Sequence, residues 1–309
     1  MGEITELALL VPGGRGQLGT DLAALGAHVG TVRAPGSADL DITSDTAVRT
    51  AITNLVDDAR IADQHPIVVN AAAYTAVDAA ETDEATAHLV NAHGPAVLAK
   101  ECAAAGVPLI HVSTDYVFAG DADHPYEPDD PTDPRSVYGH TKLAGEQAVL
   151  SATDDAWIVR TAWVYGATGG NFVKTIAKLE GLRPTLSVVD DQRGSPTWSA
   201  DLAAGLVDLA TAIADGRAPA SRVLHRTGGG ETTWFGLARA VFEELGADPA
   251  RVHPCTTADF ARPAPRPAYS VLSDEAWRAA GLVPAVPWRP ALATFFAEHG
   301  GSLRSRDSG

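Results

Sequence analysis

Short apolar runs alternate with helical stretches through the first half of this 309-residue chain. The strand-like runs cover residues 7–12, 28–33, 67–72, 109–114 and 157–164. Residues 45–59 and 84–105 lie between such runs and have the pattern of helices. Strands that are apolar on both faces and separated by helices form a parallel sheet with helices on each side. The sequence therefore predicts an α/β fold, a doubly wound parallel sheet of the Rossmann type.

The pattern changes after about residue 165. Residues 186–192 and 223–227 are typical of strands, and 198–214 and 233–245 are typical of helices. The stretch from Arg262 to Pro267 holds three prolines and is predicted to be an extended loop, because proline lacks a donor and restricts its predecessor. We expect a dinucleotide-binding domain over 1–165 to which later segments return, a smaller α/β substrate-binding lobe mainly over 166–300, and a flexible tail over 301–309.

A glycine-rich turn follows the first apolar run. Gly13, Gly16 and Gly19 have GxxGxxG spacing, and a helix is predicted to begin near Gln17. Small residues let the backbone approach a pyrophosphate, and the N-terminus of the helix supplies N–H donors. The alternative is an ordinary glycine turn, but the required strand and helix are both predicted, so we expect a dinucleotide to bind here.

The predicted second and third strands supply further cofactor candidates. Arg33 ends the second strand where an acidic residue commonly binds the ribose 2′-hydroxyl, so NADPH is favoured and NADH stays open. A solvated arginine is the competing interpretation. Asp41 and Ile42 are expected to border the adenine, and the small residues Ala71 and Ala72 end the third strand where a cofactor would pass. Tight sheet packing would explain these alanines equally well.

Tyr138 and Lys142 are four residues apart, and this spacing places both on one face of a helix. Ser113-Thr114-Asp115 follows an apolar strand and is expected at the carboxyl end of the sheet, where ligands bind in such folds. A free tyrosine has a pKa of about 10, and a nearby ammonium lowers it. We predict a hydride-transfer site in which Thr114 binds the substrate carbonyl, Tyr138 donates the proton, and Lys142 lowers the tyrosine pKa and holds the nicotinamide ribose.

Composition excludes several classes of function. A formal charge of −16 without a basic block argues against nucleic acid binding. No apolar run approaches the roughly 18 to 20 residues of a membrane span. Cys102 and Cys255 have no CxxC spacing, which fits a reducing compartment, and the N-terminus is unlike a signal peptide. We expect a cytoplasmic protein with a small-molecule substrate.

Several longer motifs carry a family resemblance: GGRGQLG (13–19), DIT (41–43), NAAAYTAVDAAE (70–81), STDYVF (113–118), YGHTK (138–142), RTAWVYG (160–166) and DDQRGSPT (190–197). Over roughly residues 7–295 the chain resembles the extended short-chain dehydrogenase/reductases and, among them, the dTDP-4-dehydrorhamnose reductase family. The resemblance implies NAD(P)H-dependent reduction of the C4 ketone of a dTDP-sugar, dTDP-4-dehydro-L-rhamnose.

The resemblance also implies roles for particular residues. The catalytic set would be Thr114, Tyr138 and Lys142. The cofactor would contact Gly13, Gly16, Gln17, Leu18, Gly19, Arg33, Asp41, Ile42, Ala71, Ala72, Tyr138 and Lys142. The substrate would contact Thr114, Asp115, Trp163, Asn171, Arg193 and Arg266, although Trp163 is otherwise typical of a core aromatic residue and lone arginines are commonly solvated.

Some relatives are similar in binding Mg2+ at a homodimer contact, through carboxylates placed like Asp21, Asp190 and Asp191. Asp21 is shorter than the glutamate expected there, and adjacent aspartates in an acidic protein often face water, so neither the metal nor the dimer is a firm expectation. Arg193 also departs from the family, which usually has an aromatic or apolar residue at this position.

Three alternatives stay open. The substrate could be another dTDP-4-keto-6-deoxyhexose of antibiotic sugar synthesis. The chain could be a non-catalytic NADP-binding regulatory subunit, similar to the methionine adenosyltransferase β subunit, although the intact Thr114, Tyr138 and Lys142 set disfavours it. It could also be an epimerase or dehydratase that retains NAD, but Tyr116 after Asp115 leaves the acidic pair of the dehydratases incomplete.

Overall fold

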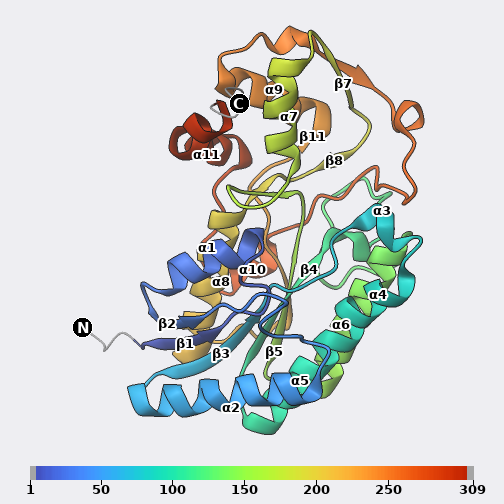
Figure 1. Cartoon of the computed structure of the whole chain (residues 1–309). Coiled ribbons are helices and arrows are strands. Elements are labelled where there is room, and N and C mark those ends of the chain that lie inside the picture. The colour runs from blue at the N-terminus through green and yellow to red at the C-terminus, as the bar shows by residue number, and fades with distance from the viewer. Residues whose placement is uncertain (1–4, 305–309) are drawn as a thin grey trace.

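The structure, a computed structural model, describes residues 5–304. Its centre is a six-stranded parallel sheet with the strand order β10-β5-β4-β3-β1-β2 (Figure 1). The strands are β1 (Leu7–Leu10), β2 (Gly30–Arg33), β3 (His65–Asn70), β4 (Leu109–Thr114), β5 (Ala156–Thr161) and β10 (Val223–His225). β2 and β3 lie on opposite sides of β1, so the order in which strands are added to the sheet reverses at β1. In folds of this kind a ligand crevice forms at such a point, at the carboxyl ends of the strands.

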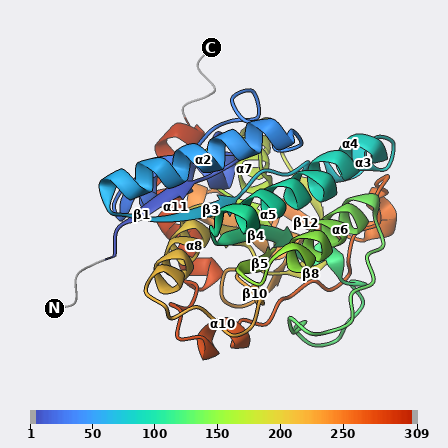
Figure 2. The same cartoon turned by 90° about the horizontal axis from the view of Figure 1, so that it is seen from below.

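Helices cover both faces of this sheet (Figure 2). One face packs against α2 (Asp45–Ala62), α5 (Gly94–Ala105) and α6 (Val137–Ala152). The other packs against α1 (Gln17–Gly26), α8 (Ser199–Ala214) and α10 (Glu275–Ala279). Successive side chains of a strand point to opposite faces, so Leu9 lies in one core and Leu10 in the other, and both are buried. The predicted doubly wound fold is confirmed.

The second half of the chain contributes both to the central sheet with its helices and to a smaller lobe. β10, α8 and α10 belong to the nucleotide-binding sheet and its helices, although they follow residue 165. The smaller lobe contains α7 (Phe172–Leu182), α9 (Trp234–Leu245) and α11 (Trp288–Arg304), packed around a separate apolar core. Its sheets are short pairs: β7 (Leu186–Val189) with β12 (Val252–Cys255), β8 (Arg193–Gly194) with β11 (Thr232–Thr233), and β6 (Val164–Tyr165) with β9 (Thr197–Trp198).

The helix predicted over 84–105 is confirmed, and it contains a π-helical turn. It consists of α4 (Glu84–His88), a π-helical turn (Leu89–His93) and α5. Within that turn the buried Asn91 accepts a bond from Tyr74 N at 2.8 Å and donates to Tyr74 O and Thr141 Oγ1, both at 3.1 Å. The π-turn therefore ties the segment after β3 to the middle of α6, and π-turns are frequent at functional sites.

Helix α11 runs to Arg304 and includes residues 301–304 of the predicted tail, while residues 305–309 lie outside the described part of the chain. No helix within residues 5–304 is long and apolar enough to cross a membrane.

Candidate active site

The three predicted catalytic residues are held by two regular elements. Thr114 is the last residue of β4, Tyr138 is the second residue of α6, and Lys142 follows one turn later. The Ser136 side chain caps α6 by accepting a bond from Gly139 N at 3.1 Å. Gly139 permits a close approach, because a Cβ there would lie 2.3 Å from Tyr116 O. The start of α6 thus fits directly against the segment that follows β4.

Burial controls the ionisation of this set. It raises the pKa of Tyr138 to about 12, and a hydrogen bond with Thr114 opposes the rise. It lowers the pKa of Lys142 to about 8, against the opposing effect of Glu146. Lys142 Nζ donates to Val112 O at 2.8 Å and lies 3.4 Å from His111 Nε2. The expected lowering of the Tyr138 pKa by Lys142 is not observed, because the ammonium is directed at β4 and desolvation dominates the phenol.

Asp115 adds a buried carboxyl to the same place. Thr114 Oγ1 donates to Asp115 Oδ1 at 2.9 Å, while Oδ2 has no hydrogen-bond partner among the described residues. Burial raises the pKa of Asp115 from 3.8 to about 6. Hydrogen bonds with Ser270 and Thr114 oppose this rise.

The glycine turn lies at the switch point between β1 and β3. Gly13 has a φ of +79°, and a Cβ there would lie 2.7 Å from the N and Cα of Ala72. Gly19 packs on the turn itself, since its Cβ would lie 2.2 Å from Gly13 O. Helix α1 has Gly16 at its N-cap and no side-chain cap, so its first N–H groups face the crevice without a protein side chain bound to them. The structure therefore brings the predicted Gly13, Ala71 and Ala72 together.

Gln17 and Asn171 meet across the two lobes. Asn171 Nδ2 donates to Gln17 Oε1 and to Gly166 O, both at 2.8 Å, and Asn171 Oδ1 accepts from Lys174 N at 3.0 Å. The amide is thus fully used by the protein, and a bond from Asn171 to a substrate phosphate would replace one of these. Leu18, the next residue of α1, is partly buried against the apolar core.

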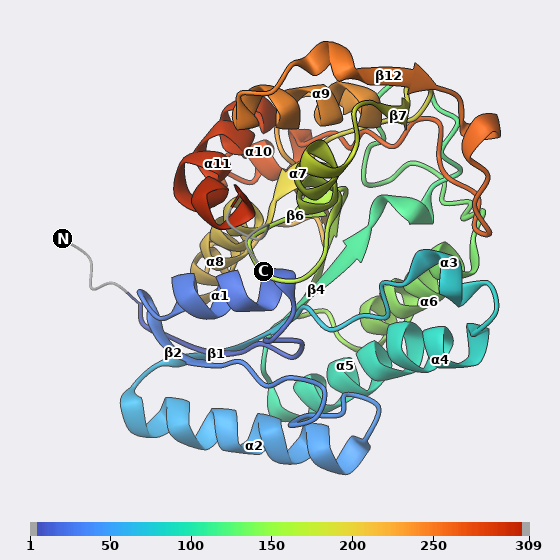
Figure 3. The same ribbon diagram turned by 45° about the horizontal axis from the view of Figure 1, so that its top comes forward.

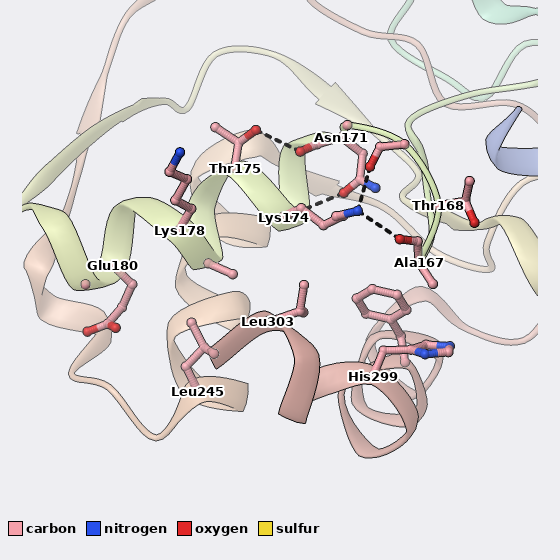
Figure 4. Close-up of a pocket in the computed structure, with 15 residues that line it drawn as sticks. Ala167, Thr168, Asn171, Lys174, Thr175, Lys178, Glu180, Leu245, His299 and Leu303 are labelled. Carbon is pink, nitrogen blue, oxygen red and sulfur yellow. Dashed lines mark hydrogen bonds between the residues drawn. The ribbon is translucent and has the colours of Figure 1, made fainter. Parts of the chain in front are cut away.

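A cavity of about 910 Å³ opens beside Asn171, between α7 and α11 (Figure 4). Lys174, Lys178 and His299 contribute polar groups to its wall, and Phe295 and Leu303 contribute apolar surface. None of the predicted catalytic residues is among the described residues that line it. The cavity is therefore separate from the predicted catalytic set.

Two arginines lie near the predicted ribose end. Arg33 is the last residue of β2, half-exposed and paired with Asp58. Arg15, which the sequence interpretation missed, pairs with Asp39 at 2.8 Å. Arg15 lies inside the glycine motif, which is defined by its glycines and does not specify this position. Of the two predicted adenine neighbours, Asp41 is exposed, and the Ile42 side chain is buried in the core.

The predicted substrate residues of the smaller lobe are partly engaged. Trp163 has a φ of +50° and stacks on Trp234 with ring centroids 3.5 Å apart, a contact not foreseen from the sequence. Arg193 NH1 donates to Glu231 Oε1 at 3.0 Å. Arg266 is 19% exposed and pairs with Asp78 at 2.9 Å. Left-handed backbone at a bulky residue is strained, and such strain is concentrated at functional sites.

The carboxylates suggested for Mg2+ each bind protein donors. Asp21 accepts from Ser199, Asp190 from Thr233 Oγ1 at 2.6 Å, and Asp191 from the backbone and hydroxyl of Thr257. Within residues 5–304 no group of three or more His, Cys, Asp or Glu side chains is arranged to hold a metal ion. A metal shared between two copies of the chain stays a prediction.

Comparison with known proteins identifies relatives over almost the whole chain. A family model described as the RmlD substrate binding domain matches residues 7–300. The dTDP-4-dehydrorhamnose reductase of Streptomyces griseus is 51% identical over 93% of this chain and 92% of its own length. The dTDP-4-keto-6-deoxy-D-glucose reductase of Streptomyces niveus is 45% identical over 93% of this chain and 96% of its own.

A solved structure agrees with these relatives. It is the dTDP-4-dehydrorhamnose reductase of Bacillus anthracis in complex with NADP, with 32% identity and a TM-score of 0.86, covering 95% of this chain and 100% of that one. The family model matches nearly every described residue, and relatives share about half of their residues with this chain. Together these matches establish the family. The chain belongs to the RmlD family of dTDP-4-dehydrorhamnose reductases.

Proposed function

We propose that this protein is an NADPH-dependent oxidoreductase that reduces the C4 ketone of dTDP-4-dehydro-L-rhamnose to dTDP-L-rhamnose. The observation that carries the proposal is the buried set at the end of β4 and the start of α6. Thr114, Tyr138 and Lys142 are 6%, 9% and 2% exposed. Relatives with about half of their residues identical have the same reductase name, which supports the substrate.

The glycine turn is suited to a nicotinamide dinucleotide. Backbone fills the space where a side chain at Gly13 would stand, so the turn is pressed against Ala72. The uncapped first N–H groups of α1 would receive the pyrophosphate. A 2′-phosphate would compete with Asp58 for Arg33 and with Asp39 for Arg15, and these arginines favour NADPH over NADH.

Bound NADPH would supply the hydride, and the side chains would handle the proton. Thr114 Oγ1 would turn its proton from Asp115 Oδ1 to the C4 oxygen as negative charge develops there. Tyr138 would transfer its phenolic proton to that oxygen, and its raised pKa keeps the proton in place near neutral pH. Lys142 would hold the nicotinamide ribose, with its ammonium anchored on Val112 O.

The test follows NADPH absorbance after the purified protein is added to dTDP-4-dehydro-L-rhamnose, made in place from dTDP-glucose by a dehydratase and an epimerase. We expect oxidation that stops when the epimerase is omitted. No oxidation with either NADPH or NADH would refute the proposal.

A second candidate is reduction of a dTDP-4-keto-6-deoxyhexose that has not been epimerised. The Streptomyces niveus relative, a dTDP-4-keto-6-deoxy-D-glucose reductase, is nearly as similar as the rhamnose enzymes, which favours this candidate over other activities. Oxidation of NADPH in the absence of the epimerase would support it.

Homodimer formation through Mg2+ is a separate proposal. It rests on Asp21, Asp190 and Asp191, all of which retain oxygen atoms that a hard cation prefers. Light scattering with Mg2+ and then with excess chelator measures it. An unchanged monomer mass in both would remove the metal-linked dimer.

A further inference from the structure

A single short helix turn contacts both the catalytic helix and the substrate-side loop. Helix α3 (Val77–Ala80) follows the cofactor-side alanines, Ala71 and Ala72. It carries Asp78, and Glu81 is its C-cap. Residues 261–267, here called the strap, reach α3 from the smaller lobe, as the orange segment beside α3 shows (Figure 1, Figure 3). The two carboxylates bind different partners.

Asp78 binds the strap at two points. Its Oδ1 accepts from Arg266 NH2 at 2.9 Å and from Ala264 N at 3.3 Å. Arg266 NH1 also donates to Ala264 O at 3.2 Å, so the guanidinium is fixed against both the carboxylate and its own backbone. Ala264 is only 1% exposed. The direction of Arg266 therefore depends on Asp78.

The same ion pair acts on Tyr116, whose ring packs against Tyr138. Burial raises the pKa of Tyr116 most, Asp115 adds to the rise, and the Arg266 charge opposes it. The Tyr116 ring meets the Tyr138 ring edge-on, with centroids 5.5 Å apart. Arg262 NH1 is 3.9 Å from Asp78 Oδ2, so two guanidinium groups share one carboxylate. Asp78 neutralises one of these two guanidinium charges, so one positive charge of the strap stays available to an anion such as a diphosphate.

Glu81 binds the catalytic helix. Its Oε1 accepts from Val137 N at 2.9 Å, and Val137 is the first residue of α6, directly before Tyr138. The first four N–H groups of a helix have no partner within the helix, and a carboxylate there is favourable to the helix dipole. Glu81 thus holds the end of α6 from which the phenol projects.

We propose that α3 is a two-sided clamp in which Asp78 positions Arg266 for the diphosphate of the nucleotide sugar and Glu81 positions the start of α6 for Tyr138. Neither residue needs to touch the reacting atoms. The identity of the diphosphate rests on the proposed function. The two halves of the clamp predict different kinetic effects, since one concerns binding and the other the chemical step.

The first experiment measures steady-state kinetics of full-length Asp78→Asn. We expect KM for the dTDP-sugar to rise about tenfold with kcat within about twofold, because an amide keeps the size but loses the charge that orients Arg266. Arg266→Gln should raise KM similarly, and the double variant should add little to Arg266→Gln alone. Additive effects in the double variant would overturn the Asp78 half of the clamp.

A matched control is Asp215→Asn. Asp215 pairs with Arg217 at 2.9 Å and is 29% exposed, close to the 31% of Asp78, but it lies at the end of α8. The KM of the Asp215→Asn variant for the dTDP-sugar should equal that of the wild type. Absence of wild-type turnover would overturn the proposed function and the clamp together, whereas wild-type turnover with an unchanged Asp78→Asn KM would overturn only the clamp.

The second experiment compares Glu81→Ala with Glu81→Gln. We expect the alanine variant to lose about tenfold in kcat with little change in KM, since a misplaced acid group impairs the chemical step. Glutamine should recover most of kcat, because its amide oxygen can still accept from Val137 N. Equal losses of kcat in both variants, or an effect confined to a higher KM, would overturn the Glu81 half of the clamp. Thermal unfolding of each variant identifies any loss of kcat that is caused by misfolding.

Discussion

The predicted catalytic side chains and the charged side chains predicted to contact the substrate are held by different means. Thr114, Tyr138 and Lys142 project from β4 and α6 and are nearly inaccessible to solvent. Arg193 and Arg266 project from a two-residue strand and a loop, and they are held by ion pairs with 47% and 19% of the arginine side chain exposed. Packing fixes the first group, and exchangeable charge pairs fix the second.

This difference indicates which properties can vary within one scaffold. Removing buried groups changes ionisation and geometry together, because desolvation raises the pKa of Tyr138 to about 12 and lowers that of Lys142 to about 8. The half-exposed Arg193–Glu231 pair contributes little to stability, so Arg193 can be redirected toward a ligand at small cost. We infer that the reduction chemistry is the constrained part of the molecule and that the choice of sugar is the adjustable part.

The largest effect is expected from Tyr138→Phe. Removing the phenolic hydroxyl deletes the proton donor while the ring keeps its packing against Tyr116. kcat should fall by about 1,000-fold, and the Kd for NADPH should stay within about twofold. Stopped-flow absorbance and fluorescence titration measure these two quantities. A variant that retained substantial turnover would remove Tyr138 as the donor.

A smaller but still large effect is expected from Gly13→Ala. The added Cβ would collide with the Ala72 backbone, and φ is +79° there, so the turn must move away from the pyrophosphate. The Kd for NADPH should rise by about 100-fold. Gly170→Ala is the matched control, because a Cβ at Gly170 meets no atom within 4 Å. Equal affinities for the two variants would show that the turn does not bind the cofactor.

The regular half of the site could be predicted from sequence because its signals are local. The apolar runs locate β1 to β5, the glycine spacing locates the turn, and the interval between Tyr138 and Lys142 places both side chains on one helical face. Each of these features depends only on residues that are close together in the sequence. The predicted strand ends differ from those observed by a few residues, and Thr114 is the last residue of β4 as expected.

The remaining features depend on contacts between distant residues. Asn91 bonds to Tyr74 and Thr141, 17 and 50 residues away, and these bonds accompany a π-turn inside the predicted helix that its sequence did not indicate. Asp78 and Arg266 are separated by 188 positions. The chain between such partners has no periodicity that links them, so only the fold reveals that they meet.

The next prediction concerns Asp115, the buried carboxyl beside Thr114. Its pKa is raised from 3.8 to about 6, so above pH 6 the folded protein bears the cost of a buried charge that the unfolded chain does not. Asp115→Asn should therefore unfold with a free energy about 2–3 kcal/mol higher at pH 7.5. As pH falls from 6 toward 4, the wild-type carboxyl takes up a proton and the difference should shrink. Urea unfolding at pH 7.5 and 4.5 checks this, and a pH-independent difference would contradict the buried-charge explanation.

The smallest effect is expected at the exposed ribose end, from Arg33→Ala. Arg33 is half-exposed and already paired with Asp58. Binding of a 2′-phosphate would therefore gain only the difference in free energy between the Arg33–phosphate pair and the Arg33–Asp58 pair. The Kd for NADPH should rise about fivefold while that for NADH stays nearly constant, and added salt should reduce the difference. Arg60→Ala, which removes an exposed arginine paired with Asp57 on α2, should change neither Kd. If Arg33→Ala weakened both nucleotides equally, the arginine would be supporting the end of β2, and Arg15 would be left as the candidate for the 2′-phosphate.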